Sequence, residues 1–261
     1  MTGPVVWWVR NDLRLQDNPV LRGAVDVANT DQRSLVAVFC FDPRFLDRSP
    51  YGRVTDPNFN KSIAGRKPVT FESRKTNALR ARFLLQSVLR LREQLEAKNS
   101  KLLICYGKPE EVLATLPAGS EVKCQSEPVS IEQSDAEKFV QTALSQRDSN
   151  LHRDHRAMNL HHPHDLPFRH HERPECFSAL GTALGWKDIW TSTERHASAT
   201  KIRKPVPVPL SWPPAAELPA LPAQIPEEVL ASEARTLERL GYSAEEIREA
   251  QAQHIPEGGE P

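Results

Sequence analysis

The chain has 261 residues and a mass of 29.4 kDa, which suits one large domain or two small ones. Its 34 Lys and Arg residues balance 34 Asp and Glu residues, so bulk charge offers no general attraction to nucleic acid phosphates. A mean hydropathy of −0.52 and 22 prolines against 11 glycines indicate that part of the chain packs poorly.

Signals for membranes and secretion are missing from the sequence pattern. No segment approaches the roughly 20 apolar residues that span a bilayer, and an apolar run directly after Pro4 leaves no room for a cleaved signal peptide. The widely spaced cysteines Cys40, Cys105, Cys124 and Cys176 form no CxxC pair, so a zinc ribbon or a thioredoxin-type site has no support. We therefore expect a soluble intracellular protein, in the cytoplasm or an organelle, without a membrane partner.

Short apolar runs rich in β-branched and aromatic residues have the length of β-strands. These runs are Val5–Val9, Leu35–Phe41, Leu102–Tyr106 and Glu121–Gln125. Their continuous apolar character predicts burial on both faces, as in a parallel sheet with crossover helices. Trp7 and Trp8 in the first run are expected to pack in the core, one on each face.

Helical patterns alternate with these strands. The first helix should begin at Asp17-Asn18-Pro19, where a side-chain oxygen can cap free amides and proline has no amide to satisfy. The longest helix is predicted from about Thr76 to Ala97, with an apolar stripe that should dock on the sheet. The positions of this stripe are Leu79, Phe83, Val88, Leu91 and Leu95.

Two further helices complete the predicted domain. One runs from Lys108 to about Leu116, and the other from Ile131 to Leu144 with Ala136, Phe139, Val140 and Leu144 directed inward. Together the elements predict a Rossmann-like, doubly wound α/β domain over residues 4–145. The polar stretch between Phe41 and Thr76 has no periodicity, so we predict no element there.

The character of the chain changes near Ser145. Histidines gather over the next segment, and residues 205–226 are dense in proline. The histidines are His152, His155, His161, His162, His164, His170 and His171. The last five of these have HxH and HH spacings that suit zinc, but no rigid element is evident to hold a metal, so we favour a polar linker over a metal site. We interpret residues 146–261 as a proline- and histidine-rich interdomain linker.

This linker is expected to run extended over a surface and to add little to the core, because proline fixes φ and removes hydrogen-bond donors. One amphipathic stretch, from Glu227 to Leu240, should form a helix that ends at Gly241.

The motifs of the commonest nucleotide-binding folds are absent, since neither GxGxxG nor GxxxxGK[ST] follows any predicted strand. Instead, the charged turn RNDLRLQDN, residues 10–18, follows the first strand, at the end where open α/β sheets bind ligands. Salt bridges and a helix cap explain such a turn as well as a ligand does. The turn therefore has both a structural and a functional interpretation.

The opening VVWWVRNDLRLQDNPVL, residues 5–21, resembles the start of the photolyase/cryptochrome family. The resemblance continues through KTNALRARFLLQSVLRLREQL, residues 75–95, and LLICYGKPEEVLATL, residues 102–116. The WWVRNDLRL opening, Lys75-Thr76 and the tetrapeptide Asp165-Leu166-Pro167-Phe168 point to the DASH cryptochromes within that family.

The resemblance implies a blue-light flavoprotein that repairs cyclobutane pyrimidine dimers or signals. FAD and the DNA-lesion pocket would belong to a helical FAD-binding domain, and the chain ends where that domain is expected to begin. We therefore expect this chain alone to hold no catalytic residue, to be inactive as a deoxyribodipyrimidine photolyase, and to meet DNA only through the helical domain.

The α/β domain of many family members helps to hold an antenna chromophore, and methenyltetrahydrofolate is the one expected here. Glu127 resembles the pterin-binding glutamate of folate-antenna members, and Glu132 is a second candidate in the same turn. An antenna flavin or deazaflavin inside the domain would instead be lined by Arg10 and the strand end at Phe39 to Phe41. Glu127 could equally be an exposed loop acid ahead of a helix.

A different class of function stays open. The chain could be a stand-alone, non-enzymatic α/β module that binds a nucleotide-like ligand or a protein partner. Its binding surface would be the apolar face that relatives bury against the helical domain.

Overall fold

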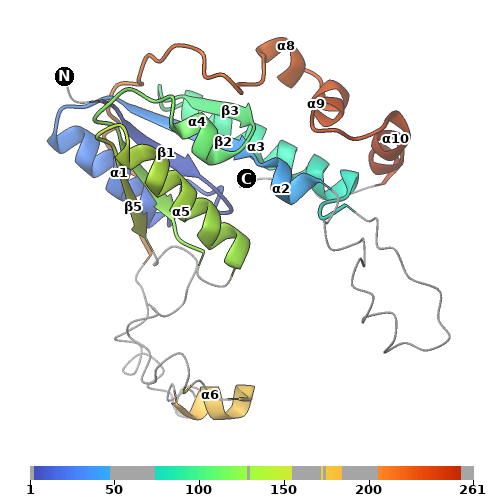
Figure 1. Cartoon of the computed structure of the whole chain (residues 1–261), viewed down its shortest axis with the longest axis horizontal. Coiled ribbons are helices and arrows are strands. Elements are labelled where there is room, and N and C mark those ends of the chain that lie inside the picture. Colours follow the sequence, from blue (N-terminus) through green and yellow to red (C-terminus); the bar gives the residue numbers. More distant parts are fainter. Residues whose placement is uncertain are drawn as a thin grey trace.

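A parallel sheet forms the centre of the computed structural model, which describes residues 3–47, 74–127, 130–154, 172, 175–183 and 205–253. The strand order is β3-β2-β1-β4-β5 (Figure 1). The strands are β1 Val5–Val9, β2 Leu35–Phe41, β3 Leu102–Tyr106, β4 Glu121–Gln125 and β5 Asn150–Asp154. The chain builds outward from β1 to β3 and then crosses back to β4 and β5. This confirms the predicted Rossmann-like, doubly wound α/β fold.

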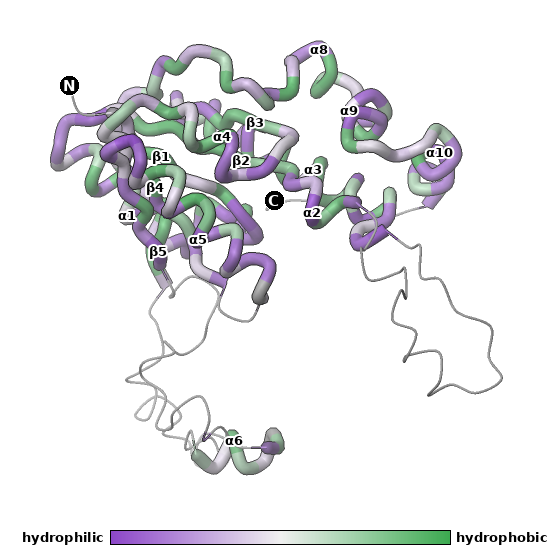
Figure 2. The backbone as a smooth tube through the Cα atoms, in the orientation of Figure 1, coloured by the Kyte–Doolittle hydropathy of each residue, from purple (hydrophilic) through white to green (hydrophobic). Residues whose placement is uncertain are grey.

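Helices cover both faces of the sheet. On one face lie α1, Pro19–Thr30, and α3, Ala78–Glu96, and on the other lie α4, Pro109–Leu113, and α5, Ile131–Ser145. Along these helices, hydrophobic and hydrophilic stretches alternate (Figure 2). Trp7 belongs to the first core cluster and Trp8 to the second, which confirms their placement on opposite faces.

The ends of the predicted helices follow local chemistry. Asn18 caps α1, since its Oδ1 accepts the Leu21 amide at 2.9 Å and Pro19 is the first helical residue. Asn77 caps α3 in the same way through the Arg80 amide at 2.9 Å. The predicted helix starts are therefore confirmed to within two residues.

Two aromatic residues that were predicted to face inward are exposed instead. Phe83 in α3 is 44% exposed and Phe139 in α5 is 51% exposed. The buried stripe of α5 follows Ala136, Val140 and Leu144, and Phe139 lies about 100° from Val140 around the helix. The inward assignment of these two rings was wrong because hydrophobicity alone does not fix the angular position of a stripe.

The fifth strand was not predicted. β5 pairs with β4 from Asn150 to Asp154, but Leu151 is its one buried side chain, so it lacks the apolar signature of the other strands. His152 lies in this strand, and the sheet therefore continues past residue 145. His155, His161, His162, His164, His170 and His171, the tetrapeptide 165–168 and residues 254–261 lie outside the described residues.

Within residues 205–253, three helices follow the proline-dense segment, where one was predicted. They are α8 Glu227–Leu230, α9 Glu233–Arg239 and α10 Ala244–Ala252. Ser232 breaks the predicted single helix because it caps α9, and Gly241 ends α9 with φ +91° as expected. Two short helices elsewhere, α2 Pro43–Leu46 and α6 Phe177–Ala183, were also not predicted.

The C-terminal segment adds more to the core than an extended linker would. Side chains from Ile225 to Ala250 join the cluster beneath α1 and α3, and α9 and α10 lie beside α3 (Figure 1). The segment also hydrogen bonds to the edge of β3, through the Tyr106 amide to the Ala223 carbonyl and the Ile225 amide to the Ile104 carbonyl, both at 2.8 Å. The division into a domain ending at residue 145 and a linker from 146 to 261 stays a prediction.

Within the described ranges, no helix is long and apolar enough to cross a membrane.

Candidate functional site

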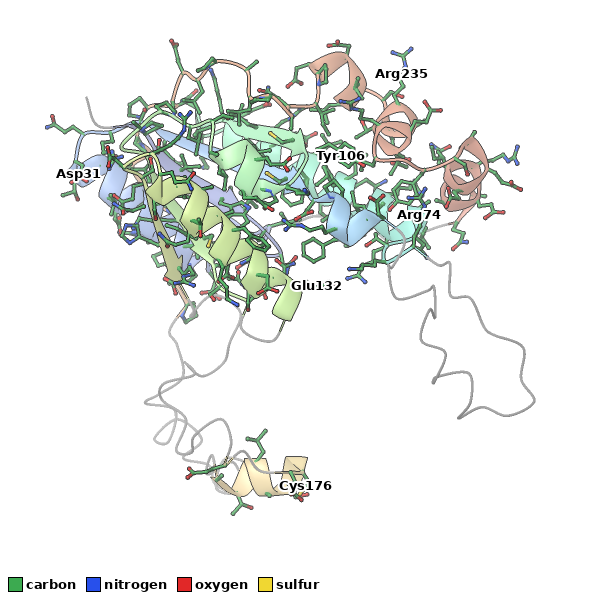
Figure 3. The ribbon with its side chains drawn as sticks, viewed as in Figure 1. Asp31, Arg74, Tyr106, Glu132, Cys176 and Arg235 are labelled. Atoms are coloured by element: carbon green, nitrogen blue, oxygen red, sulfur yellow. The ribbon has the colours of Figure 1, made fainter. Side chains whose placement is uncertain are left out.

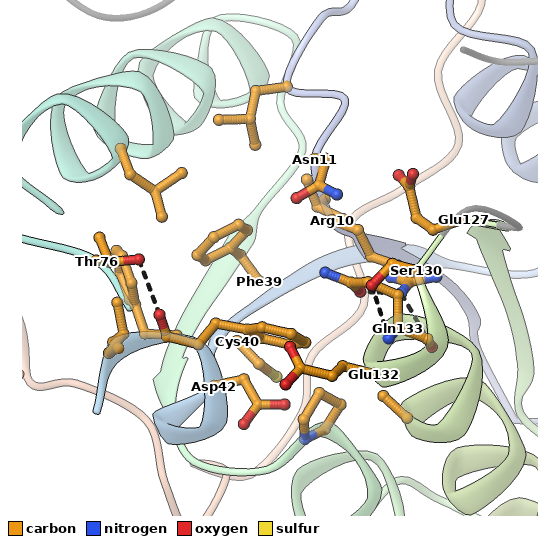
Figure 4. Close-up of a pocket in the computed structure, with 18 of the residues that line it drawn as sticks. Arg10, Asn11, Phe39, Cys40, Asp42, Thr76, Glu127, Ser130, Glu132 and Gln133 are labelled. Atoms are coloured by element: carbon orange, nitrogen blue, oxygen red, sulfur yellow. Dashed lines mark hydrogen bonds between the residues drawn. The ribbon is translucent and has the colours of Figure 1, made fainter. Parts of the chain in front are cut away.

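A cavity of about 670 Å³ opens at the carboxyl ends of β1, β2 and β4 (Figure 4). The fold places it there because the chain reverses its direction of growth at β1, between β2 on one side and β4 on the other. Open α/β sheets bind ligands outside the carboxyl ends of the strands at such a switch point. The volume falls within the roughly 300–1,000 Å³ of small-molecule sites.

One wall of the cavity is aromatic. Phe39 and Phe41 stand at the end of β2 with their rings in an edge-to-face arrangement, 4.9 Å between centroids. Phe83 reaches the same cavity from α3, which accounts for part of its exposure. A planar ligand would find aromatic faces and edges on this side.

The start of α3 supplies cationic and hydroxyl groups. Lys75, Thr76 and Arg80 line the cavity, and the Thr76 hydroxyl donates to the Phe45 carbonyl at 2.8 Å (Figure 4). This bond ties the start of α3 to α2. It fixes a wall where an anionic group would be favoured.

Arg10 follows β1 directly and is 8% exposed. Its Nη1 donates to the Gln125 carbonyl at 2.8 Å and to Glu137 Oε1 at 2.5 Å, while its Nη2 donates to Gln133 Oε1. The guanidinium also lies over the Trp8 ring, 4.9 Å from the centroid. Arg10 lines the cavity, but its Nη donors are directed at the protein.

Glu127 follows β4 and lines the same cavity (Figure 4). It is 9% exposed, so the interpretation as an exposed loop acid is wrong. Its Oε1 accepts from Gln125 Nε2 at 2.9 Å. Burial raises the pKa of Glu127, while the nearby charge of Arg10 and a hydrogen bond with Asn11 act in the opposite direction.

Glu132 lies in the first turn of α5 (Figure 3) and also lines the cavity. Its side chain is 48% exposed, and it forms an ion pair with Lys75 of the opposite wall. The structure therefore brings Arg10, Glu127 and Glu132 to one cavity, where Glu132 and Lys75 close one side of it.

The rest of the charged turn is structural. Arg14 donates to both carboxylate oxygens of Asp12, at 2.8 and 3.0 Å, and Asn18 caps α1. Asp17 exchanges two hydrogen bonds with Val206 of the C-terminal segment, each 2.9 Å long. Of residues 10–18, only Arg10, Asn11 and Leu13 line the cavity.

Three polar residues around Arg10 were not predicted: Gln125, Gln133 and Glu137. Glu137 is 2% exposed although it is charged, and it lies beside Ala136 and Val140 on the buried side of α5. A carboxylate on an apolar stripe was the one signal in the sequence that marked it, because such a group is almost never buried without a partner. Among the described residues, no group of three or more potential metal ligands is found.

A doubly wound sheet with a cavity at its switch point defines the class of α/β domains that bind a ligand at the carboxyl edge of the sheet. The chain belongs to the DNA photolyase family, because the sequence model of that family matches residues 5–185. Its matched part is the N-terminal α/β domain.

Within this family, the chain is similar to cryptochromes and a blue-light photoreceptor. A cryptochrome DASH of Gloeobacter violaceus is 34% identical over 87% of this chain and 38% of its own length. The blue-light photoreceptor PHR2 of Arabidopsis thaliana is 34% identical over 67% of this chain and 34% of its own length. The crystal structure of a cryptochrome from Synechocystis sp. PCC6803 superposes with a TM-score of 0.64 and 26% identity, covering 85% of this chain and 40% of that one. The chain thus spans about two fifths or less of these relatives.

Proposed function

We propose that this chain is the antenna-binding domain of a DASH-type cryptochrome or photolyase and that its cavity holds a folate chromophore of the methenyltetrahydrofolate type. The observation that carries the proposal is the position of Glu127, a buried carboxylate on a cavity that also has an aromatic wall and a cationic wall. Members of the family bind FAD and antenna cofactors.

The chemistry of the cavity fits a folate. A pterin ring has amide and amino donors, and the Glu127 carboxylate is an acceptor that can take two of them. The ring is planar and apolar on its faces, which suits Phe39 and Phe83. The glutamate tail of a folate is anionic, which suits Lys75 and Arg80 at the start of α3. When bound, the folate would supply absorption of near-ultraviolet and blue light.

The three predicted site residues take different parts in this proposal. Glu127 contacts the ligand, whereas Arg10 shapes the wall, since its Nη donors are engaged with Gln125, Gln133 and Glu137. Glu132 is a weaker ligand candidate because it is half exposed and paired with Lys75. Displacing that ion pair would free Lys75 for an anionic ligand.

The partner of this domain is proposed to be a helical FAD-binding domain. The matches cover 38% and 34% of the two relatives' own lengths, which leaves room for such a domain in each of them. Repair of pyrimidine dimers or light signalling, contact with DNA, and FAD binding would belong to that partner domain. In this account the present chain contributes light capture and support.

The test is an optical titration of the purified chain with methenyltetrahydrofolate, with FAD titrated in parallel. Folate should bind with a shifted absorption band, and Glu127→Gln should weaken binding by roughly tenfold or more, since a hydrogen bond to a charged group is worth about 1.5–3 kcal/mol. Glu111→Gln is the matched control, because Glu111 is exposed on α4 and outside the cavity.

Other outcomes of this titration would replace the proposal. Binding of a flavin in place of folate would assign the cavity to a flavin antenna lined by Arg10 and the end of β2. Binding of neither chromophore would favour the stand-alone interaction module. Folate binding that survives Glu127→Gln unchanged would place the ligand elsewhere.

A further inference from the structure

We propose that Glu137, a buried residue of α5, is a positioning residue that holds Glu127 in place at the edge of the cavity. Glu137 Oε1 accepts two hydrogen bonds, one from the Glu127 amide at 3.1 Å and one from Arg10 Nη1 at 2.5 Å. Its Oε2 accepts the Ser126 hydroxyl at 3.2 Å. One carboxylate therefore joins the end of β1, the end of β4 and α5.

Charge explains why this arrangement is rigid. The side chains of Arg10 and Glu137 are 4% and 3% exposed, so each charge depends on the other for its solvation. Arg153 of β5 adds a second positive charge 3.9 Å from Glu137 Oε2. Hydrogen bonds between charged groups in such a setting are short and directional, which restricts the groups that share them.

Glu137 itself does not line the cavity, so it acts through its neighbours. The backbone of Ser126 and Glu127 is fixed on one side by the β4–β5 bond from the Ser126 amide to the Asp154 carbonyl, at 2.9 Å. On the other side it is fixed by Glu137. Loss of Glu137 would release the main chain that carries the Glu127 carboxylate, without removing that carboxylate.

This inference rests on the proposed function for its meaning, because positioning Glu127 matters only if Glu127 binds the ligand. Its structural part can be tested without any ligand. The two claims therefore have separate readouts.

The first experiment measures hydrogen exchange at the Glu127 amide by NMR in the full 261-residue chain. Glu137→Met keeps the side-chain length but removes both acceptor oxygens, so exchange at the Glu127 amide should accelerate by roughly tenfold or more. Asp135→Asn, which removes an exposed charge from the same helix, is the matched control and should leave this amide unchanged. If Glu137→Met does not fold, Glu137→Gln keeps one acceptor and should give a smaller acceleration of the same sign.

The second experiment is a double-mutant cycle on folate affinity. Glu137→Met and Glu127→Gln should each weaken binding by about tenfold, and the double variant should be no weaker than Glu127→Gln alone, because Glu137 acts through Glu127. A merely structural role would instead give losses that multiply in the double variant.

The two experiments separate the positioning role of Glu137 from the proposed binding of folate. Unchanged exchange at the Glu127 amide in a folded Glu137 variant would overturn the positioning role, and so would losses that multiply in the cycle. Absence of folate binding by the unaltered chain, together with accelerated exchange in Glu137→Met, would reject the proposed function but keep the structural role of Glu137.

Discussion

Glu127 is a carboxylate whose surroundings act on its ionisation in opposite directions. Burial favours the protonated form, whereas Arg10 and Asn11 favour the ionised form, and the net result is a pKa above the ordinary value of 4.5. A ligand with amide and amino donors requires the ionised form. The same residue should therefore control both the stability of the free domain and its affinity for a folate.

The pH dependence of stability follows from the direction of this shift. Because the folded-state pKa is raised, the stability that Glu127 contributes is fully present below pH 4.5 and is lost as pH rises through the folded-state pKa. Glu127→Gln cannot titrate. The free energy of unfolding of the unaltered chain should therefore fall relative to that of Glu127→Gln as pH rises from about 4 to about 7, measured by urea denaturation.

The control for this prediction is Glu111→Gln, whose exposed carboxylate lies outside the cavity. Its difference from the unaltered chain should show no comparable decline over the same pH range. A constant difference between the unaltered chain and Glu127→Gln would mean that Glu127 is as well solvated as in the unfolded chain, contrary to its burial in the structure.

Sequence reasoning named Arg10, Glu127 and Glu132, which line one cavity in the structure, but it did not predict the hydrogen bonds that connect the cavity's surroundings. Arg10 was named because it follows a strand at the carboxyl edge of the sheet, and Glu127 because its position resembles the pterin-binding glutamate of folate-antenna family members. Glu137 was missed because its importance depends on Arg10, a residue far away in the chain. The exposure of Phe83 was missed for a similar reason, since it depends on a cavity that several elements form together.

The connection between α9 and α10 shows how one residue sets the course of an element. The Gly241 amide donates to the Glu238 carbonyl and the Tyr242 amide to the Leu237 carbonyl, which is the pattern of a Schellman C-cap. Gly241 has φ +91°, and Tyr242 then donates from its hydroxyl to the Thr76 carbonyl at 2.8 Å. The cap thus places a residue that holds the start of α3, one wall of the cavity.

Two glycine substitutions should have opposite effects on stability. Gly241→Ala should destabilise the fold by about 1–2 kcal/mol, because a Cβ is strained at positive φ. Gly23→Ala in α1 should stabilise it by about 0.5–1 kcal/mol, since its Cβ would meet nothing within 4 Å and alanine favours a helix. Thermal denaturation of both variants beside the unaltered chain gives the comparison, and equal shifts of the same sign would contradict it.

Elements with local signals were predicted well. The Asn18-Pro19 start of α1 and the continuous apolar runs of β1 to β3 need no distant partner to be recognised. β5 and the division of the last helices depend on packing, because β5 is an edge strand with one buried side chain and α9 begins at the Ser232 cap. Such elements are defined by the neighbours that they meet in the folded chain.

Within the described residues, the N-terminal α/β layers and the C-terminal segment pack against each other. Residues from the C-terminal segment share a core cluster with β1, α1 and α3. An ion pair between Arg82 of α3 and Glu233 of α9, 2.9 Å apart, also joins the two parts. Arg74 stacks over the Tyr242 ring at 4.7 Å and adds a further link (Figure 3 labels Arg74). The α/β layers and the C-terminal helices should therefore unfold together.

A matched pair of leucine substitutions tests this shared core. Leu237 is 0% exposed in α9, so Leu237→Ala should lower the free energy of unfolding by about 2–5 kcal/mol. Leu210 is fully exposed in the proline-dense segment, so Leu210→Ala should change it by less than about 0.5 kcal/mol. Urea denaturation followed by tryptophan fluorescence gives both values. A small effect of Leu237→Ala would mean that the C-terminal helices are not integral to the core.

The proposed folate chromophore would lie in the cavity between β1, β2, β4 and the starts of α3 and α5. A crystal structure of this chain, from crystals grown with methenyltetrahydrofolate, would test this placement. We expect ring density against Phe39, with the Glu127 carboxylate within hydrogen-bonding distance of the pterin donors. Clear density for the folate at another surface, with this cavity filled only by solvent, would contradict it.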